Sequence, residues 1–219
     1  MTITLFILIA TILVSITCLQ NREYFFKLDF RPYMIQRNKE WYRFISHAFV
    51  HADGFHLVVN MYVLYTFGKT VEVQYGQLFG ELWIPMFLLL YFGGILFSAI
   101  PGYARNRDDY SYHGVGASGA VSAIVFTYIL INPMRPLGLI FIPGFDLPAI
   151  IFGVLYLIYE IYMDRNRKSP IAHSAHYFGA IYGVIFTASM KPELILRLWN
   201  EYGFPVSYTH LTLPTICSV

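Results

Sequence analysis

Four polar residues inside otherwise apolar stretches could together carry out hydrolytic chemistry: His56, Asn60, Ser118 and His176. Polar side chains in membrane-length apolar segments are costly, so they are functional candidates by default. A serine hydroxyl is a weak nucleophile that needs an adjacent base, and histidine is the best base near neutral pH. The residue types therefore predict Ser118 as a nucleophile and His176 as its general base.

The other two residues suit the charge that develops during such a reaction. A tetrahedral intermediate needs hydrogen-bond donors aimed at its oxyanion. His56 and Asn60 can supply side-chain donors, and their i, i+4 spacing places them on one helix face. The backbone N–H of Ser118, at a helix start, can supply another donor where the helix dipole favours negative charge. We therefore predict His56 and Asn60 as oxyanion donors.

Six apolar segments must position these residues. A bilayer-spanning helix needs about 20 mostly apolar residues, and fewer if its ends lie within protein. The segments cover roughly residues 3–19, 55–67, 82–100, 118–131, 147–163 and 176–190. The second, fourth and sixth are short and open with polar residues, which indicates helices surrounded by other helices beneath a water-filled space. The pattern predicts an all-α membrane protein with six transmembrane helices.

This topology brings the four polar residues to a common depth. The second, fourth and sixth helices run in the same direction, because each pair is separated by two crossings. His56 starts the second helix, Ser118 opens the fourth and His176 opens the sixth, while Asn60 lies one turn after His56. All four are therefore expected near one side of the membrane.

Glycines support contact between the fourth and sixth helices. Gly116 permits a tight turn before Ser118, and Gly119 lets another helix come close. Gly179 and Gly183 share a face with His176, at i+3 and i+7. Small residues in this pattern let membrane helices touch, so we predict that they bring His176 to Ser118.

Composition supports a membrane protein and excludes several other classes. Hydrophobic residues make up 57% of the 219-residue chain and charged residues only 13%, whereas soluble domains carry about 25% charged residues. The net charge of +2, with scattered basic residues, gives no argument for nucleic-acid binding. Cys18 and Cys217 lie at opposite ends of the chain and are poor evidence for a disulfide.

A metal site is the main alternative use of the histidines. His47 and His51 are spaced i, i+4 and lie close in sequence to His56. Zinc sites need three or more convergent ligands, and the sequence contains no HExxH motif. We therefore predict no metal and no cofactor, and interpret His47 and His51 as structural residues.

Two further ionisable residues lie near the predicted site. His173 precedes His176 by one turn, so either could be the base; the Ala-His-x-x-Gly context favours His176. Glu160 lies in the fifth segment and could relay protons. Because it is near the end of that segment, where it can reach water, we interpret it as structural.

The motifs together resemble the rhomboid family of intramembrane serine proteases. The resemblance covers roughly residues 37–190, in family order, and rests on Trp41-Tyr42-Arg43, His51-Ala52-Asp53-Gly54-Phe55-His56 continuing to Asn60, Gly116-Ala117-Ser118-Gly119, and Ala175-His176-Tyr177-Phe178-Gly179 with Gly183. It implies a six-helix bundle and a Ser–His dyad without a carboxylate. It also implies that Ser118 is acylated, that His176 takes its proton, and that the other two residues line the oxyanion hole.

The resemblance implies three further features. Trp41 and Arg43 would lie in a long first loop partly embedded in the outer leaflet. Glu72 matches a glutamate that ties the far end of the second helix to the bundle. Family members often place an aromatic residue one turn after the nucleophile, against the histidine, and here Ser122 stands at that position. The sequence therefore leaves open how His176 is held.

Membrane orientation depends on which argument is used. Most lysines and arginines lie in loops on the side opposite the termini, which by charge alone would place the termini outside. The resemblance implies the reverse, with cytoplasmic termini and an active site that opens to the outside. We follow the resemblance and expect a multi-pass protein of a bacterial-type inner membrane.

The resemblance also divides the chain. Residues 1–36 would form the first transmembrane helix and the start of the first loop, and residues 37–190 the rhomboid protease core. Residues 191–205 would form a C-terminal tail. Residues 206–219 are Thr-rich, uncharged and without helical period, so we leave open whether they are native. The first segment lacks a basic leader and a cleavage site, so we expect an uncleaved helix.

The function implied is that of a serine endopeptidase that cleaves transmembrane segments of membrane proteins within the lipid bilayer. The alternative is an inactive rhomboid-like protein that binds or dislocates membrane clients, but such relatives typically lose the serine or the histidine. A transporter would show internal repeats, which this sequence lacks. The sequence leaves the substrate and the oligomeric state open.

Overall fold

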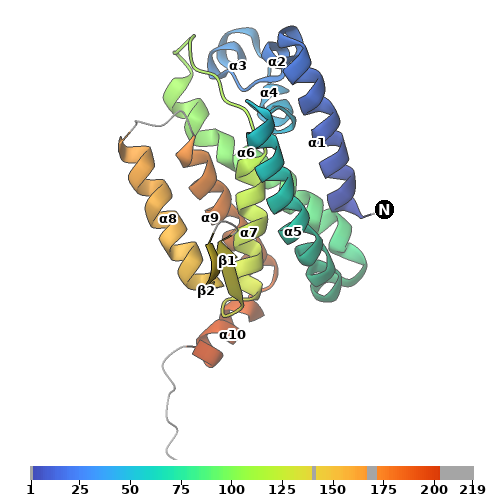
Figure 1. Cartoon of the computed structure of the whole chain (residues 1–219), viewed down its shortest axis with the longest axis vertical. Helices are drawn as coiled ribbons and strands as arrows, with labels where there is room; N and C mark the ends of the chain where they lie inside the picture. The colour runs from blue at the N-terminus through green and yellow to red at the C-terminus, as the bar shows by residue number, and fades with distance from the viewer. Residues whose placement is uncertain (1, 140–141, 167–171, 203–219) are drawn as a thin grey trace, which may run out of the picture.

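The computed structural model describes residues 2–139, 142–166 and 172–202, and over these ranges the protein is a helical bundle (Figure 1). The long helices are α1 (Ile3–Gln20), α5 (Gly54–Phe79), α6 (Trp83–Asn106), α7 (Ser118–Ile131), α8 (Ala149–Asn166) and α9 (His173–Met190). Short helices between α1 and α5 are α2 (Arg22–Leu28), α3 (Pro32–Asn38), α4 (Arg43–Ser46) and η1 (His47–Phe49). The remaining elements are η2 (Gly80–Leu82), β1 (Pro136–Leu139), β2 (Ile142–Pro148) and α10 (Glu193–Tyr202).

The six apolar segments of the sequence correspond in order to the long helices, and α7 has the predicted bounds. Three helices are longer than predicted by three residues or more: α5 ends at Phe79, α6 ends at Asn106 and α9 begins at His173. With 26 and 18 residues, α5 and α9 are long enough to span a bilayer. The expectation that the second segment is too short is therefore wrong, because polar residues continue α5. Among the described residues, α9 is not one of the helices that are both long and apolar enough to cross a membrane.

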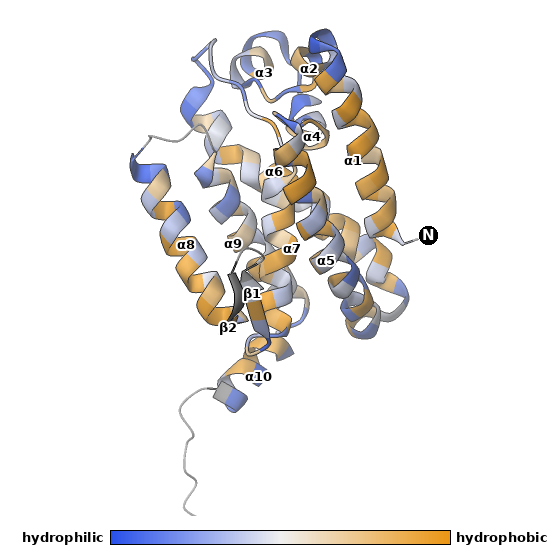
Figure 2. Ribbon diagram, in the orientation of Figure 1, coloured by the Kyte–Doolittle hydropathy of each residue, from blue (hydrophilic) through white to orange (hydrophobic). Residues whose placement is uncertain are grey.

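The exterior of the bundle is apolar. Ile3–Gln20 and the stretch Gly54–Asn106, which contains α5 and α6, are long and apolar enough to cross a membrane by length and composition, and α7 is a shorter apolar helix. Phe6 and Leu13 on α1 are each 62% exposed, and Figure 2 shows hydrophobic residues along the length of α1. Exposed apolar surface on this scale is suited to contact with lipid rather than with water.

α7 lies in the interior of the bundle. Nearly every residue from Gly119 to Ile131 is buried, and α5, α6, α8 and α9 all pack against this helix. A helix that is hydrophobic on all sides is expected to be enclosed by others. The prediction that the fourth segment is surrounded by helices is confirmed.

α7 and α9 meet at glycines. A β-carbon on Gly179 would overlap the carbonyl oxygen of Gly119, and one on Gly183 would overlap the carbonyl oxygen of Ala123. Since the contact advances by four residues on both helices, α7 and α9 run in the same direction with their backbones touching. The predicted glycine contact between these helices is confirmed.

Glu72 connects α5 to the start of α1. Its carboxylate accepts hydrogen bonds from the backbone N–H of Ile3 at 2.9 Å, from the backbone N–H of Thr4 at 3.1 Å and from the Thr4 hydroxyl at 2.7 Å. The first N–H groups of a helix have no partner within the helix, so the carboxylate satisfies two of them. The expected tie at the far end of α5 is present.

Between α7 and α8 the structure has two strands that were not predicted. β1 and β2 pair antiparallel, with an irregularity between Gly138 and Leu139. The stretch contains prolines and glycines and lacks the alternating pattern that signals a strand. At the C-terminus, α10 lies within the predicted tail 191–205, while residues 206–219 lie outside the described residues.

Candidate active site

The predicted nucleophile and base lie in hydrogen-bond contact. Ser118 is the first residue of α7, and His176 lies in the first turn of α9. Because these helices are parallel and touch at glycines, both first turns lie at the same level. The Nε2 atom of His176 is 2.8 Å from the Oγ atom of Ser118. That separation is the one needed for a base to take the hydroxyl proton.

Gly116 makes the turn that places Ser118 at the start of α7. Its φ of +121° lies in a region that residues with side chains rarely adopt. A β-carbon there would lie 2.9 Å from Cε1 of His56, and the backbone N–H donates to the carbonyl oxygen of His47 at 3.0 Å. Both the conformation and the close approach therefore require glycine.

The predicted oxyanion donors lie on α5, close to this turn. Asp53 caps the helix by accepting from the backbone N–H of His56 at 2.8 Å, and the His56 ring faces Gly116. Asn60 is buried one turn further along, and its Nδ2 donates to the carbonyl oxygen of His56 at 3.0 Å. An amide nitrogen has a second hydrogen to donate. The structure thus places His56 next to the turn at Gly116 that precedes Ser118. The side-chain hydrogen bond of Asn60 lies within α5.

His51 joins three parts of the protein behind the site. Its Nδ1 lies 2.9 Å from the hydroxyl of Ser15 on α1, and its Nε2 lies 3.5 Å from the backbone nitrogen of Ala117. Its ring packs edge-on against the ring of His56 at 5.0 Å. Burial lowers the pKa of His51 to about 3, so it is neutral at physiological pH. Its contacts agree with the structural interpretation.

The segment between α1 and α5 is held by a buried arginine. The Nη1 atom of Arg43 donates to Oδ1 of Asp29 at 2.8 Å and to the Asp29 carbonyl oxygen at 2.7 Å. The Nε atom donates to Glu40 at 2.6 Å. Trp41 is 54% exposed on the same segment. Both Arg43 and Trp41 therefore lie in the long first loop, as expected.

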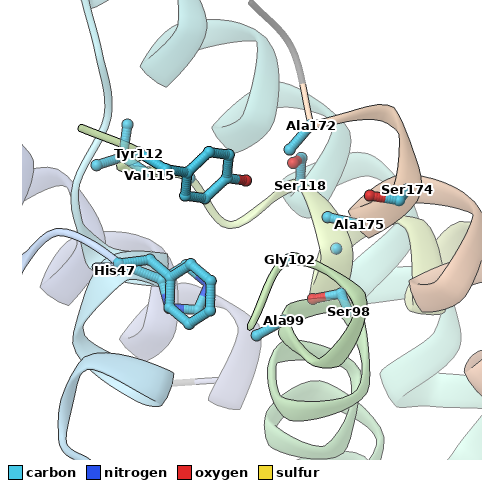
Figure 3. Close-up of a pocket in the computed structure, with 14 residues that line it drawn as sticks. His47, Ser98, Ala99, Gly102, Tyr112, Val115, Ser118, Ala172, Ser174 and Ala175 are labelled. Atoms are coloured by element: carbon cyan, nitrogen blue, oxygen red, sulfur yellow. The ribbon is translucent and has the colours of Figure 1, made fainter. Parts of the chain in front are cut away.

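A small cavity of about 40 Å³ adjoins the nucleophile. Figure 3 shows its lining, which comes from the first loop, from α6, from the segment before α7 and from the start of α9. Ser118 is one of the lining residues, with Ser98 and Ser174 nearby. A cavity of this size with serine hydroxyls in its lining can hold water, which hydrolysis of an acyl-enzyme requires.

Sequence reasoning missed the buried contact between Glu160 and His173. Glu160 was expected to reach water, yet it is only 4% exposed, because α9 covers that face of α8. One carboxylate oxygen, Oε2, lies 2.7 Å from Nδ1 of His173 and 3.1 Å from Nδ1 of His176. The available signal was an ionisable residue in an apolar segment.

Ser122 stands where family members often have an aromatic residue. Its Oγ lies 3.5 Å from the hydroxyl of Tyr156 on α8.

A family model of the rhomboid domain matches residues 38–193, which is well over half of the chain. The chain belongs to the rhomboid family. Membership implies an integral membrane protein built as a helical bundle, which agrees with the helical fold and apolar exterior. The matched range of this rhomboid includes all of the predicted site residues.

Individual relatives agree with the family match. RHOMBOID-like protein 12, mitochondrial, of Arabidopsis thaliana is 33% identical over 156 residues, which cover 67% of this chain and 46% of that protein. Presenilin-associated rhomboid-like protein A, mitochondrial, of Danio rerio is 26% identical over 161 residues, which cover 70% of this chain and 40% of that protein. Rhomboid protease GlpG of Haemophilus influenzae is 28% identical over 156 residues, which cover 71% of this chain and 72% of that protein. The chain spans less than half the length of the first two relatives.

Proposed function

We propose that this rhomboid is an intramembrane serine endopeptidase that cleaves transmembrane segments of other membrane proteins. The observation that carries the proposal is the 2.8 Å contact between Nε2 of His176 and Oγ of Ser118, at the start of two parallel helices. The resemblance of this chain to one relative that is named a protease, Rhomboid protease GlpG, supports the same reaction class.

The proposed reaction follows from these positions. His176 Nε2 takes the proton of Ser118 as Oγ attacks the carbonyl carbon of the scissile peptide bond. The backbone N–H of Ser118 and the side chain of His56, with Asn60, would donate to the oxyanion. His176 then gives its proton to the leaving amine. Water next attacks the acyl ester on Ser118 and regenerates the free hydroxyl, without a metal or a cofactor.

In the proposed arrangement all six long helices span a membrane, with the termini in the cytoplasm and the site opening to the outside. The first loop would cover the site from the outer leaflet, and the cavity beside Ser118 would supply water. We also propose that the protein lies in a bacterial-type inner membrane. The match to the bacterial relative covers 72% of that protein, whereas those to the mitochondrial relatives cover 46% and 40%.

The proposed substrate is a transmembrane segment that unwinds near the membrane surface. An intact helix hides its carbonyl carbons behind its own hydrogen bonds and side chains, so Ser118 can attack only an unwound stretch. Small residues, among them Ala99, Gly102 and Ala172, line the cavity next to Ser118. This lining supports a small side chain immediately before the cut.

Labelling with a fluorophosphonate probe in detergent tests the nucleophile. We expect the purified protein to be labelled and Ser118→Ala to show no labelling, because the probe reacts only with an activated serine. Equal labelling of both proteins would contradict the proposal. If neither protein is labelled, the result favours the alternative of an inactive rhomboid-like protein that binds membrane clients.

Separate variants test which histidine is the base. His176→Ala should abolish labelling, because no other base is in contact with Ser118 in the described residues. His173→Ala should retain part of the activity, since its Nδ1 contacts Glu160 rather than the nucleophile. Loss of activity in His173→Ala alone would show that the assignment of the base is wrong.

A further inference from the structure

Glu160 and two histidines form a buried polar cluster directly behind the proposed dyad. The ligand-type atoms of Glu160, His173 and His176 lie within 4.8 Å of one another. Glu160 and His173 have side chains only 5% and 4% exposed, and that of His176 is 16% exposed. The proposed reaction uses only one of these three groups. A buried carboxylate in an apolar environment is costly unless hydrogen bonds compensate it, so its position requires an explanation.

The distances are those of hydrogen bonds. Two ligand atoms that are each about 2.0–2.1 Å from a tetrahedral zinc ion lie about 3.3 Å apart. Oε2 of Glu160 lies 2.7 Å from Nδ1 of His173, which is too close for two zinc ligands and typical of a charge-assisted hydrogen bond. His173 therefore donates its Nδ1 hydrogen to the carboxylate and holds it in place on α8.

The same oxygen faces the proposed base. Nδ1 of His176 lies 3.1 Å from Oε2 of Glu160, while Nε2 of the same ring lies 2.8 Å from Ser118. The N–H direction at Nδ1 is not yet aligned with the oxygen, and no regular hydrogen bond is formed. Catalytic hydrogen bonds are commonly poorly aligned without substrate and tighten during the reaction. A rotation of the imidazole that aligns this N–H with the oxygen would complete the chain from carboxylate to nucleophile.

We propose that Glu160 is a positioning residue that completes a Ser118–His176–Glu160 relay, with His173 holding the carboxylate. This inference rests on the proposed function and adds a third member to the dyad. It also answers how His176 is held in a chain where Ser122 offers no ring to pack against it.

The relay changes what the base can do. A carboxylate at Nδ1 fixes the hydrogen on that nitrogen and leaves the lone pair of Nε2 aimed at Ser118. When Nε2 takes the serine proton, the ring becomes a cation next to a buried anion. The carboxylate stabilises that cation, and the proton stays on the imidazole until the leaving amine accepts it. These proton transfers need no group other than the three side chains and the substrate.

Three variants test the relay by the rate of fluorophosphonate labelling. We expect Glu160→Gln to label more slowly by up to about 10⁴-fold, the loss that an amide replacement of the carboxylate causes in a serine–histidine–aspartate site. Glu160→Asp keeps the charge and should recover most of the lost rate. Asp164→Asn is the matched control, because Asp164 lies one turn further along α8, where it pairs with Arg105 at 2.9 Å and accepts from the Tyr177 hydroxyl at 3.2 Å. An asparagine side-chain oxygen can still accept from either group. Asp164→Asn should label at the wild-type rate.

A pH–rate profile separates positioning from support of the fold. The titratable neighbours of His176 in the described residues are Glu160, His173 and, across the site from α5, His56. Losing the anion makes the protonated imidazole less favourable, so half-maximal labelling should occur at lower pH in Glu160→Gln. A purely structural role would lower the thermal stability of the variant and leave this midpoint unchanged.

A spectroscopic measurement on the wild-type protein covers the case in which Glu160→Gln does not fold. Nitrogen-15 NMR of histidine-labelled protein, assigned with His176→Gln, reports which ring nitrogen carries the hydrogen. The relay requires hydrogen at Nδ1 and a free lone pair at Nε2 of neutral His176. Hydrogen at Nε2 in the resting protein would overturn the inference.

The outcomes distinguish this inference from the proposed function. If wild type is not labelled, or is labelled independently of Ser118, the proposed function itself fails. If labelling depends on Ser118 but folded Glu160→Gln matches Asp164→Asn in rate and pH midpoint, only the relay fails. Slower labelling with a shifted midpoint, and recovery in Glu160→Asp, supports both.

Discussion

At the residue scale, the site depends on how a few side chains and one backbone turn fit around Ser118. Gly116, with φ of +121°, directs the chain into α7 beside the ring of His56. The hydroxyl of Ser118 then meets Nε2 of His176 at 2.8 Å. The site therefore depends on a residue that takes no part in the chemistry.

Replacing Gly116 by alanine tests this dependence. The positive φ is strained for any residue with a β-carbon, at a cost of about 1–3 kcal/mol, and the methyl group would press on His56. We expect Gly116→Ala to lower both the thermal unfolding temperature and the rate of fluorophosphonate labelling.

Gly114→Ala provides the control for that substitution. A β-carbon on Gly114 would make only ordinary contacts, at 3.8 Å or more, with Phe30 and Tyr112. The control should therefore keep the wild-type labelling rate. Equal rates in the two alanine variants would show that the Gly116 turn does not position Ser118.

The sequence predicted Ser118, His176 and the glycines because their spacing in the chain carries the information. It did not predict that Glu160 is buried beside His173 and His176. That position depends on how α8 is rotated against α9, and the apolar pattern of α8 does not specify a buried face, since its outer side chains are apolar too. Nearness to a segment end was therefore mistaken for access to water.

At the element scale, two polar ties hold the helices that surround α7. One is Glu72, whose carboxylate receives three hydrogen bonds from the start of α1. The other is the first loop, where Arg43 and two histidines are buried. The apolar pattern predicted the helices themselves, but α5 is longer than predicted because polar residues, Glu72 among them, continue it to Phe79.

Removing the charge of Glu72 should loosen this tie without touching the site. Hydrogen bonds to a charged group contribute about 1.5–3 kcal/mol, so Glu72→Gln should lower the thermal unfolding temperature while the labelling rate at low temperature stays unchanged. Glu193→Gln is the control, because Glu193 is largely exposed and its pair with Lys191, at 3.5 Å, is weak. Equal unfolding temperatures for Glu72→Gln and Glu193→Gln would show that Glu72 does not stabilise the contact between α5 and α1.

The buried histidines of the first loop should make stability depend on pH. Burial lowers the pKa of His47 to about 4 and that of His51 to about 3, against about 6.5 in an unfolded chain. Below about pH 6.5 the unfolded chain binds protons that the folded chain excludes. The free energy of unfolding should therefore fall as the pH falls, by about 1.4 kcal/mol per pH unit for each excluded proton.

Thermal unfolding at pH 7 and pH 5 measures this effect. The unfolding temperature should be lower at pH 5, and His47→Gln should reduce the difference. His113→Gln replaces an exposed histidine and should leave the difference between the two unfolding temperatures unchanged. An unfolding temperature that does not change between the two pH values would show that neither buried ring excludes a proton.

At the scale of the whole molecule, composition and apolar segments predicted a helical membrane protein, and the structure and the family match agree. Side-chain contacts between helices could not be predicted, because residues such as Glu72 and Glu160 find partners 68 and 13 positions away in the chain. The charge count of the loops does not fix orientation, since several basic residues, such as Arg43, are paired within the folded first loop.

The most direct test of the central claim is cleavage of a single-span reporter protein in reconstituted lipid vesicles, with the cut located by mass spectrometry. We predict one main cut within or at the edge of the apolar span, after a small residue, and no cut with Ser118→Ala. A cut that persists in Ser118→Ala, or a wild-type protein that leaves suitable spans intact, would contradict the assignment of this rhomboid as an intramembrane serine endopeptidase.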